Sequence, residues 1–95
     1  MKTGVELIAE ERKRQIEVEG WSNEHDKAHF PDNLALAGVC YALPSYMRKY
    51  ENGKPFFWPF DEEWWKPSQD NRLKELVKAG ALIAAEIDRL QNEIK

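Results

Sequence analysis

The sequence predicts an all-α fold, a small helical bundle of three main helices plus an aromatic, proline-rich loop. Two observations carry this prediction. A capping-box pattern precedes the first apolar-periodic segment, and a long stripe with helical spacing occupies the end of the chain. Three helices of this length give a thin core, so we expect oligomerisation to complete the bundle. We expect no paired strands.

Length and composition limit the classes of protein that fit. The chain has 95 residues, enough for one domain over residues 1–95. Its formal net charge of −3 argues against duplex nucleic acid as a partner, because that binding needs a basic surface. The longest apolar run, Leu34–Leu43, is too short to cross a membrane, and residues 1–4 lack the apolar stretch of a signal peptide. The lone Cys40 fits a cytoplasmic location.

The first expected helix spans Thr3–Glu19. Thr3 and Glu6 have the spacing of a capping box, and Gly20 is a typical residue beyond a helix C-terminus. Arg12 falls on the same helical face as Val5, Ile8 and Ile16. We expect this face to meet another helix.

Two further helices follow. The second, Asn33–Leu43, is apolar on nearly every side, and a short piece near Ser45–Tyr50 follows Pro44. The last, Asn71–Asn92, carries a clean apolar stripe. Its members are Leu73, Leu76, Val77, Gly80, Ile83, Ala84, Ile87, Leu90 and, just beyond, Ile94. We expect the second and last helices to lie at a homo-oligomer interface.

Polar residues on the first helix raise two alternatives. In the first, an internal pocket is lined by Arg12, Gln15 and Glu19, with Glu11 nearby. In the second, the stem of Arg12 lies on apolar surface while its head group reaches water. In the pocket hypothesis, the same cavity is reached from elsewhere in the chain. The residues expected to reach it are Trp21, His25, Asp26 and Glu86.

Two kinds of metal site are compatible with the sequence. His25 and His29 have the spacing of one helical face and suit a transition metal, although the same segment is also typical of an exposed loop turn. Carboxylates suit Mg²⁺ better, and Glu11, Asp26 and Glu86 are the candidate ligands. The alternative is that these carboxylates lie on solvated helix faces. Near the aromatic segment, Trp65 can stack on a base, while Lys66 and Lys78 can contact phosphates. The alternative for the tryptophans is that they complete a small core.

Several of these residues form a pattern that resembles a known group. The first part reads Glu10-Glu11-Arg12-x-x-Gln15-x-x-x-Glu19-Gly20-Trp21, then His25-Asp26; the second contains Trp65-Lys66-Pro67, then Lys78, Glu86 and Arg89. The pattern resembles small phage and prophage proteins described as MazG-like. This resemblance implies the all-α nucleoside triphosphate pyrophosphatases, helical oligomers that use Mg²⁺ to cut a nucleoside triphosphate into a monophosphate and pyrophosphate.

Two functional hypotheses follow. The first is a Mg²⁺-dependent pyrophosphatase acting on free (deoxy)nucleotides, with Glu11 or Glu19 as the base that activates water. Its substrate contacts are Arg12, Gln15, Trp21, His25, Trp65, Lys66 and Lys78. The second is a non-catalytic, phage-derived binding module that sequesters a nucleotide or inhibits a host protein through its aromatic loop. Departures from the pyrophosphatase pattern motivate the second hypothesis, because Lys13 and Arg14 follow Glu10-Glu11 and Arg89 follows Glu86 where the family has carboxylates.

Overall fold

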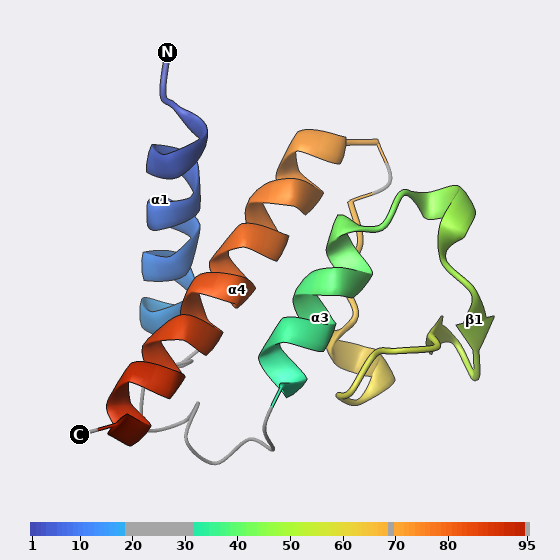
Figure 1. The fold of residues 1–95 in the computed structure, drawn as a ribbon. Helices are drawn as coiled ribbons and strands as arrows, with labels where there is room; N and C mark the ends of the chain where they lie inside the picture. The colour runs from blue at the N-terminus through green and yellow to red at the C-terminus, as the bar shows by residue number, and fades with distance from the viewer. Residues whose placement is uncertain (19–31, 69, 95) are drawn as a thin grey trace.

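The computed structural model describes residues 1–18, 32–68 and 70–94, which are mostly helical (Figure 1). Its helices are α1 (Gly4–Glu17), α3 (Asn33–Ala42) and α4 (Arg72–Ile94). Two short 3-10 helices, η1 (Ser45–Met47) and η2 (Glu62–Trp64), lie between α3 and α4, together with strands β1 (Tyr50–Glu51) and β2 (Lys54–Pro55). The prediction of three main helices is confirmed.

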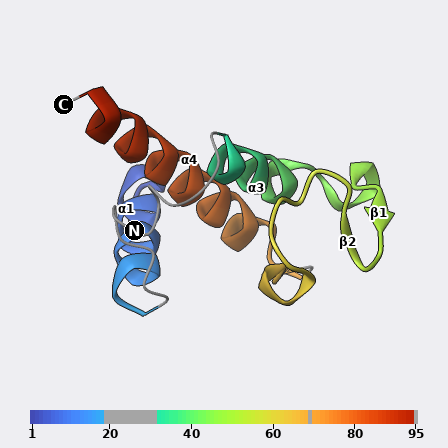
Figure 2. The same cartoon turned by 90° about the horizontal axis from the view of Figure 1, so that it is seen from below.

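Helix α4 is the central element of the described fold. Both α1 and α3 pack against it. Figure 2 shows α3 and α4 in one layer, with α1 on one side of that layer and the hairpin beyond the end of α3. The connection from the hairpin to α4 passes beside α3 and carries η2.

The ends of α1 and α3 have simple local causes. At the start of α1, the Thr3 hydroxyl accepts a hydrogen bond from the Glu6 N–H, while the Glu6 carboxylate accepts one from the Thr3 N–H. This reciprocal pair is the capping box that the sequence predicts. The helix ends at Glu17, and the expected end at Glu19 lies outside the described residues. Helix α3 ends at Ala42, because Pro44 disfavours helical backbone in the residue before it.

The core lies between α3 and α4. Small residues allow the two helices to approach closely, and a Cβ at Gly38 would lie 3.2 Å from the Ala79 carbonyl oxygen. Ring packing from the connecting segment closes one end of this core, where Tyr41 contacts Trp58 and Trp65. The buried hydrophobic residues of this core are Leu34, Ala37, Cys40, Tyr41, Trp58, Ala79, Leu82 and Ala85.

The apolar stripe of α4 lies mostly outside this core. Leu73 is 60% exposed and Ile87 is 51% exposed. The face of α4 that is buried instead combines small or apolar residues with charged ones, among them Glu75, Glu86 and Arg89. The strongest hydrophobic pattern in the sequence therefore marks a surface of the single chain.

The expectation of no paired strands is wrong. Strands β1 and β2 pair antiparallel, with Tyr50 opposite Pro55 and Glu51 opposite Lys54. The two residues between them, Asn52 and Gly53, have φ angles of 56° and 82°. Positive φ at both positions is the requirement of the two-residue turn that favours Asn-Gly and matches the twist of a hairpin. The dipeptide thus contained the signal for this hairpin.

We expect Gly53→Ala to destabilise the fold by about 1–2 kcal/mol, the cost of placing a Cβ in the left-handed region. The new Cβ would also lie 2.5 Å from a Glu62 carboxylate oxygen, so that side chain must move. Urea unfolding measures the loss. Gly4→Ala is the matched control, because a Cβ there meets no atom within 4 Å. Equal stability of the two variants would contradict this account of the turn.

Candidate functional site

Helix α1 places polar side chains against α4. Arg12 is 8% exposed, and its Nε lies 3.6 Å from an Asp88 carboxylate oxygen. Gln15 is 2% exposed and donates through Nε2 to Glu11 at 3.3 Å. Its Oε1 is buried and accepts no hydrogen bond from the described residues. The Arg12 head group is therefore held in the α1–α4 interface and does not extend into water.

Glu11, the candidate base and metal ligand, is engaged by a neighbouring arginine. Arg14 donates to its two oxygens at 2.8 and 2.7 Å. Burial alone would raise the pKa of Glu11, but the Arg14 hydrogen bonds and charge, with Gln15 and Lys78 assisting, outweigh burial and lower the pKa. A general base works best with a pKa near the working pH. The low pKa makes Glu11 a weak proton acceptor.

Glu86, the second described metal candidate, is also paired. Arg89 donates to its oxygens at 2.8 and 3.0 Å, and both side chains are buried. The Arg89 hydrogen bond is the largest influence on Glu86 and lowers its pKa against the opposing effect of burial. The Asp32 N–H also donates to Glu86 at 3.3 Å. This carboxylate thus ties α4 to the start of α3.

The two described members of the predicted magnesium site, Glu11 and Glu86, are each paired with an arginine. Glu11 and Glu86 direct their oxygens at guanidinium groups, which compete with a cation for the same lone pairs. Across residues 1–18, 32–68 and 70–94, no three His, Cys, Asp or Glu side chains are grouped as a metal would require. The remaining predicted site residues, Glu19, Trp21, His25 and Asp26, lie outside the described residues.

The other predicted substrate contacts lie at a second location, on the aromatic side of α4. Lys78 donates to the Lys66 carbonyl at 2.8 Å, and its ammonium lies 5.4 Å from the Tyr41 ring centroid. Trp65 packs at 4.7 Å, between centroids, on the same Tyr41 ring. The adjacent Trp64 is exposed and lies 5.7 Å from the Lys66 ammonium. Trp65 therefore packs against the core, while Trp64 is exposed to solvent.

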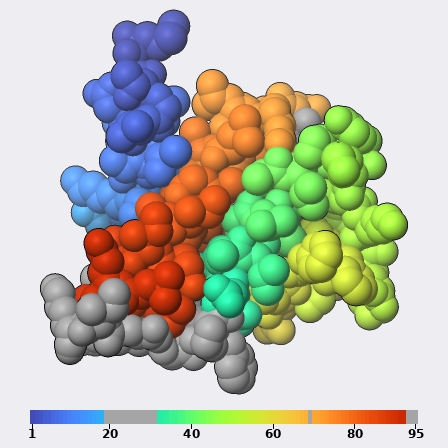
Figure 3. Space-filling model, in the orientation of Figure 1, coloured from blue at the N-terminus to red at the C-terminus, as the bar shows by residue number. Residues whose placement is uncertain are grey.

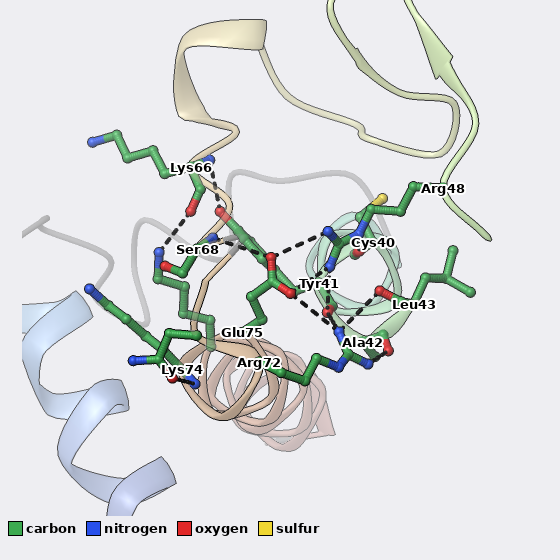
Figure 4. Close-up of polar contacts among 12 residues, drawn as sticks. Cys40, Tyr41, Ala42, Leu43, Arg48, Lys66, Ser68, Arg72, Lys74 and Glu75 are labelled. Atoms are coloured by element: carbon green, nitrogen blue, oxygen red, sulfur yellow. Dashed lines mark hydrogen bonds and ion pairs between the residues drawn. The ribbon is translucent and has the colours of Figure 1, made fainter. Parts of the chain in front are cut away.

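A buried ion pair that the sequence pattern does not predict lies between the end of α3 and α4 (Figure 4). The Arg48 guanidinium donates to the two carboxylate oxygens of Glu75 at 3.2 and 3.1 Å. The Ser68 N–H and Arg72 donate to the same carboxylate. Burial would raise the pKa of Glu75, but the hydrogen bonds and charge of Arg48 dominate and lower it. Glu75 is off the apolar stripe of α4, so the pattern gave no reason to expect it inside.

The same arginines cap the C-terminal end of α3. Arg48 donates to the carbonyls of Cys40 at 2.8 Å and Tyr41 at 3.1 Å. Arg72 donates to the carbonyls of Tyr41, Ala42 and Leu43. The last carbonyls of a helix have no partner within it, and cations are favoured at that end by the helix dipole. This buried pair therefore completes α3 and fixes the chain that leads into the hairpin.

A groove of about 700 Å³ opens between the end of α3 and the hairpin. Its aromatic side chains reach solvent, with Phe56 63% and Phe57 53% exposed. The residues that line it are Cys40, Leu43, Met47, Arg48, Lys49, Tyr50, Glu51, Pro55, Phe56 and Phe57. None of the predicted site residues is among them. The adjacent Phe56-Phe57, next to an Asn-Gly hairpin, was the available sequence signal.

Comparison with protein-family models, with curated proteins and with solved structures finds no match to this chain. Within the described part of the chain, no helix combines the length and apolar character needed to cross a bilayer. The resemblance to MazG-like proteins stays a prediction. The geometry of the described residues is the basis for a functional assignment.

We expect the stability of the protein to fall in acid partly through Glu75. Its pKa is lower in the folded chain than the usual 4.5, so its contribution is complete above pH 4.5 and is lost as the pH falls through the folded value. Glu75→Gln should lose about 3 kcal/mol at neutral pH, because it breaks a buried ion pair, and should show a shallower acid dependence. Urea unfolding at several pH values measures both.

The matched control for this measurement is Glu63→Gln, which changes an exposed carboxylate on η2. It should leave both the stability and its acid dependence close to those of the parent protein. A Glu75→Gln protein as stable as this control would contradict the role assigned to the buried pair.

Proposed function

We propose that the protein is a homo-oligomeric, non-catalytic binding module that takes an apolar segment of a partner protein into the groove beside its hairpin. The observation that carries this proposal is the group of exposed aromatic side chains around the groove, Tyr50, Phe56 and Phe57. Exposed Met47 lies beside them. Aromatic residues and methionine are enriched in the parts of protein surfaces that contact other proteins.

The carboxylates support the non-catalytic half of the proposal. Hydrolysis of a triphosphate would require several oxygens to hold Mg²⁺ and one base to activate water. In the described chain, Glu11, Glu75 and Glu86 each accept hydrogen bonds from at least one arginine, and each has a lowered pKa. Glu75 and Glu86 also accept hydrogen bonds from backbone N–H groups outside α4, whereas the hydrogen-bond partners of Glu11 lie on α1.

The charges at the groove favour a protein segment over a nucleotide. Lys49 and Glu51 lie on its lining with opposite signs, so they nearly cancel. The guanidinium of Arg48 is directed at Glu75 and the α3 carbonyls. A triphosphate is recognised by several charge-assisted hydrogen bonds, which this lining does not offer. Apolar and aromatic side chains of a protein segment need no such hydrogen bonds. By the resemblance to phage proteins, we expect the partner to be a host protein.

Selection from a random linear peptide library tests the groove. We expect enrichment of peptides with aromatic or aliphatic anchors, and loss of at least about tenfold in their affinity on Phe56→Ala/Phe57→Ala, since buried aromatic anchors contribute more than 1 kcal/mol each. Tyr46→Ala is the matched control, because Tyr46 is exposed on η1 but does not line the groove. Selected peptides that bind the double variant unchanged, or no enrichment at all, would overturn the proposal.

A second test addresses catalysis directly. The protein is incubated with Mg²⁺ and each ribo- and deoxyribonucleoside triphosphate, and pyrophosphate is measured. We expect release no faster than in a protein-free blank. Release that disappears in Glu11→Gln, with the free energy of unfolding unchanged, would instead establish the pyrophosphatase hypothesis and its assignment of Glu11.

A further inference from the structure

The exposed side of α4 is an apolar ridge. Its large members are Leu73, Leu76, Ile83, Ile87 and Leu90, all of them exposed. They are spaced in steps of three, four or seven, so that residues 76, 83 and 90 form one row, while residues 73 and 87 form another that is interrupted at Gly80, where Ile8 of α1 packs. This is the spacing of the two core positions of a coiled coil. No charged residue interrupts either row.

The ridge continues onto α3. Ile83 packs on Gly38, with its Cγ1 3.1 Å from where a Cβ would stand. Leu36 and Val39, on the same helix, are exposed hydrophobic residues. Figure 3 shows α4 and α3 side by side on one face of the molecule, with no other described element in front of α4. We call the exposed apolar residues of α3 and α4 the α3–α4 face.

The charge distribution of α4 separates this face from the rest of the helix. Its buried side carries Glu75, Glu86 and Arg89, each in an ion pair. A helix normally turns its apolar stripe to the core and its charges to water. The reversed arrangement in α4 indicates that a second apolar surface covers the stripe.

The size of the face suits a second copy. From Leu73 to Leu90 the ridge is about 25 Å long, at 1.5 Å per residue, and two packed helices are about 20 Å wide. These dimensions give an area of about 500 Å² on each copy, or about 1,000 Å² for two copies, which is the lower bound for a specific interface between proteins. Two rows at core spacing are also self-complementary, as a two-fold interface requires.

We propose that the α3–α4 face is the interface of a two-fold homodimer, in which α4 of one copy packs on α4 of the other and α3 flanks it on both sides. The resulting core contains four helices. This inference names the interface of the homo-oligomer in the proposed function and rests on it. The groove beside the hairpin stays open in such a dimer, because its exposed lining, Met47, Tyr50, Phe56 and Phe57, lies outside the face.

Sedimentation equilibrium of the full chain tests the interface. We expect the parent protein to have twice the chain mass of 11.1 kDa at micromolar concentration. Ile87→Glu should sediment as a monomer, because each copy would place a carboxylate in an apolar interface. Tyr46→Glu is the matched control, an exposed hydrophobic residue away from the face, and should remain dimeric.

A milder variant covers the case in which Ile87→Glu does not fold, as judged by circular dichroism. Ile87→Ala keeps the helix and should raise the Kd of the dimer by about tenfold or more. An assembly unaffected by both Ile87 variants would overturn the α3–α4 face while leaving the homo-oligomer of the proposed function intact. A monomeric parent protein would overturn both. Peptide binding at the groove is measured separately and is independent of either result.

Discussion

The buried carboxylate of Glu75 is the interaction on which the described fold most depends. Pro44 stops α3 and leaves its last carbonyls without helical partners. Arg48 and Arg72 supply the missing donors. Two guanidinium groups so close together require a counter-charge, and Glu75 provides it with good geometry. One carboxylate therefore joins the end of α3, the segment before the hairpin and the first turn of α4.

The packing of α4 follows from this requirement. To bring Glu75 inside, the helix must turn its first buried residue toward the end of α3, and the helical period then determines the rest of the buried side. The positions that follow on that side include Ala79, Leu82, Glu86 and Arg89. Small side chains let α3 approach closely, and Arg89 neutralises Glu86. The long aliphatic residues of α4 are left on the outer side by the same rotation.

The sequence predicts the helices well because their signals are local. The Thr3–Glu6 capping box and the periodic run that ends the chain need only neighbouring residues to be recognised. The orientation of α4 could not be predicted, because hydrophobicity alone points Leu73 and Ile87 inward. The hairpin was missed although Asn52-Gly53 is a strong turn signal, since strands of two residues leave no alternation to detect.

The candidate site was harder to predict than the fold. The sequence predicts that the helical face at Arg12 and Gln15 meets another helix, and the structure does bury both side chains. Their partners could not be derived, because Asp88 is far away in sequence and is brought close only by tertiary packing. The sequence analysis did not pair Glu11 with Arg14 or Glu86 with Arg89, although each arginine lies three residues further on, on the same helical face. Oppositely charged residues three positions apart on a helix form ion pairs, and this spacing was the sequence signal for both pairs.

The chemistry of the single thiol follows from its place beneath the groove. Cys40 is fully buried, and burial raises the pKa of its thiol to about 11 despite the nearby charge of Arg48. At neutral pH almost no thiolate forms, and thiolate is the species that reacts with oxidants and alkylating agents. Burial and the raised pKa of the thiol therefore make Cys40 slow to react with oxidants and alkylating agents. Only a fluctuation that opens the end of α3 would expose the Cys40 sulfur. The rate at which this thiol is modified therefore reports how often the end of α3 opens.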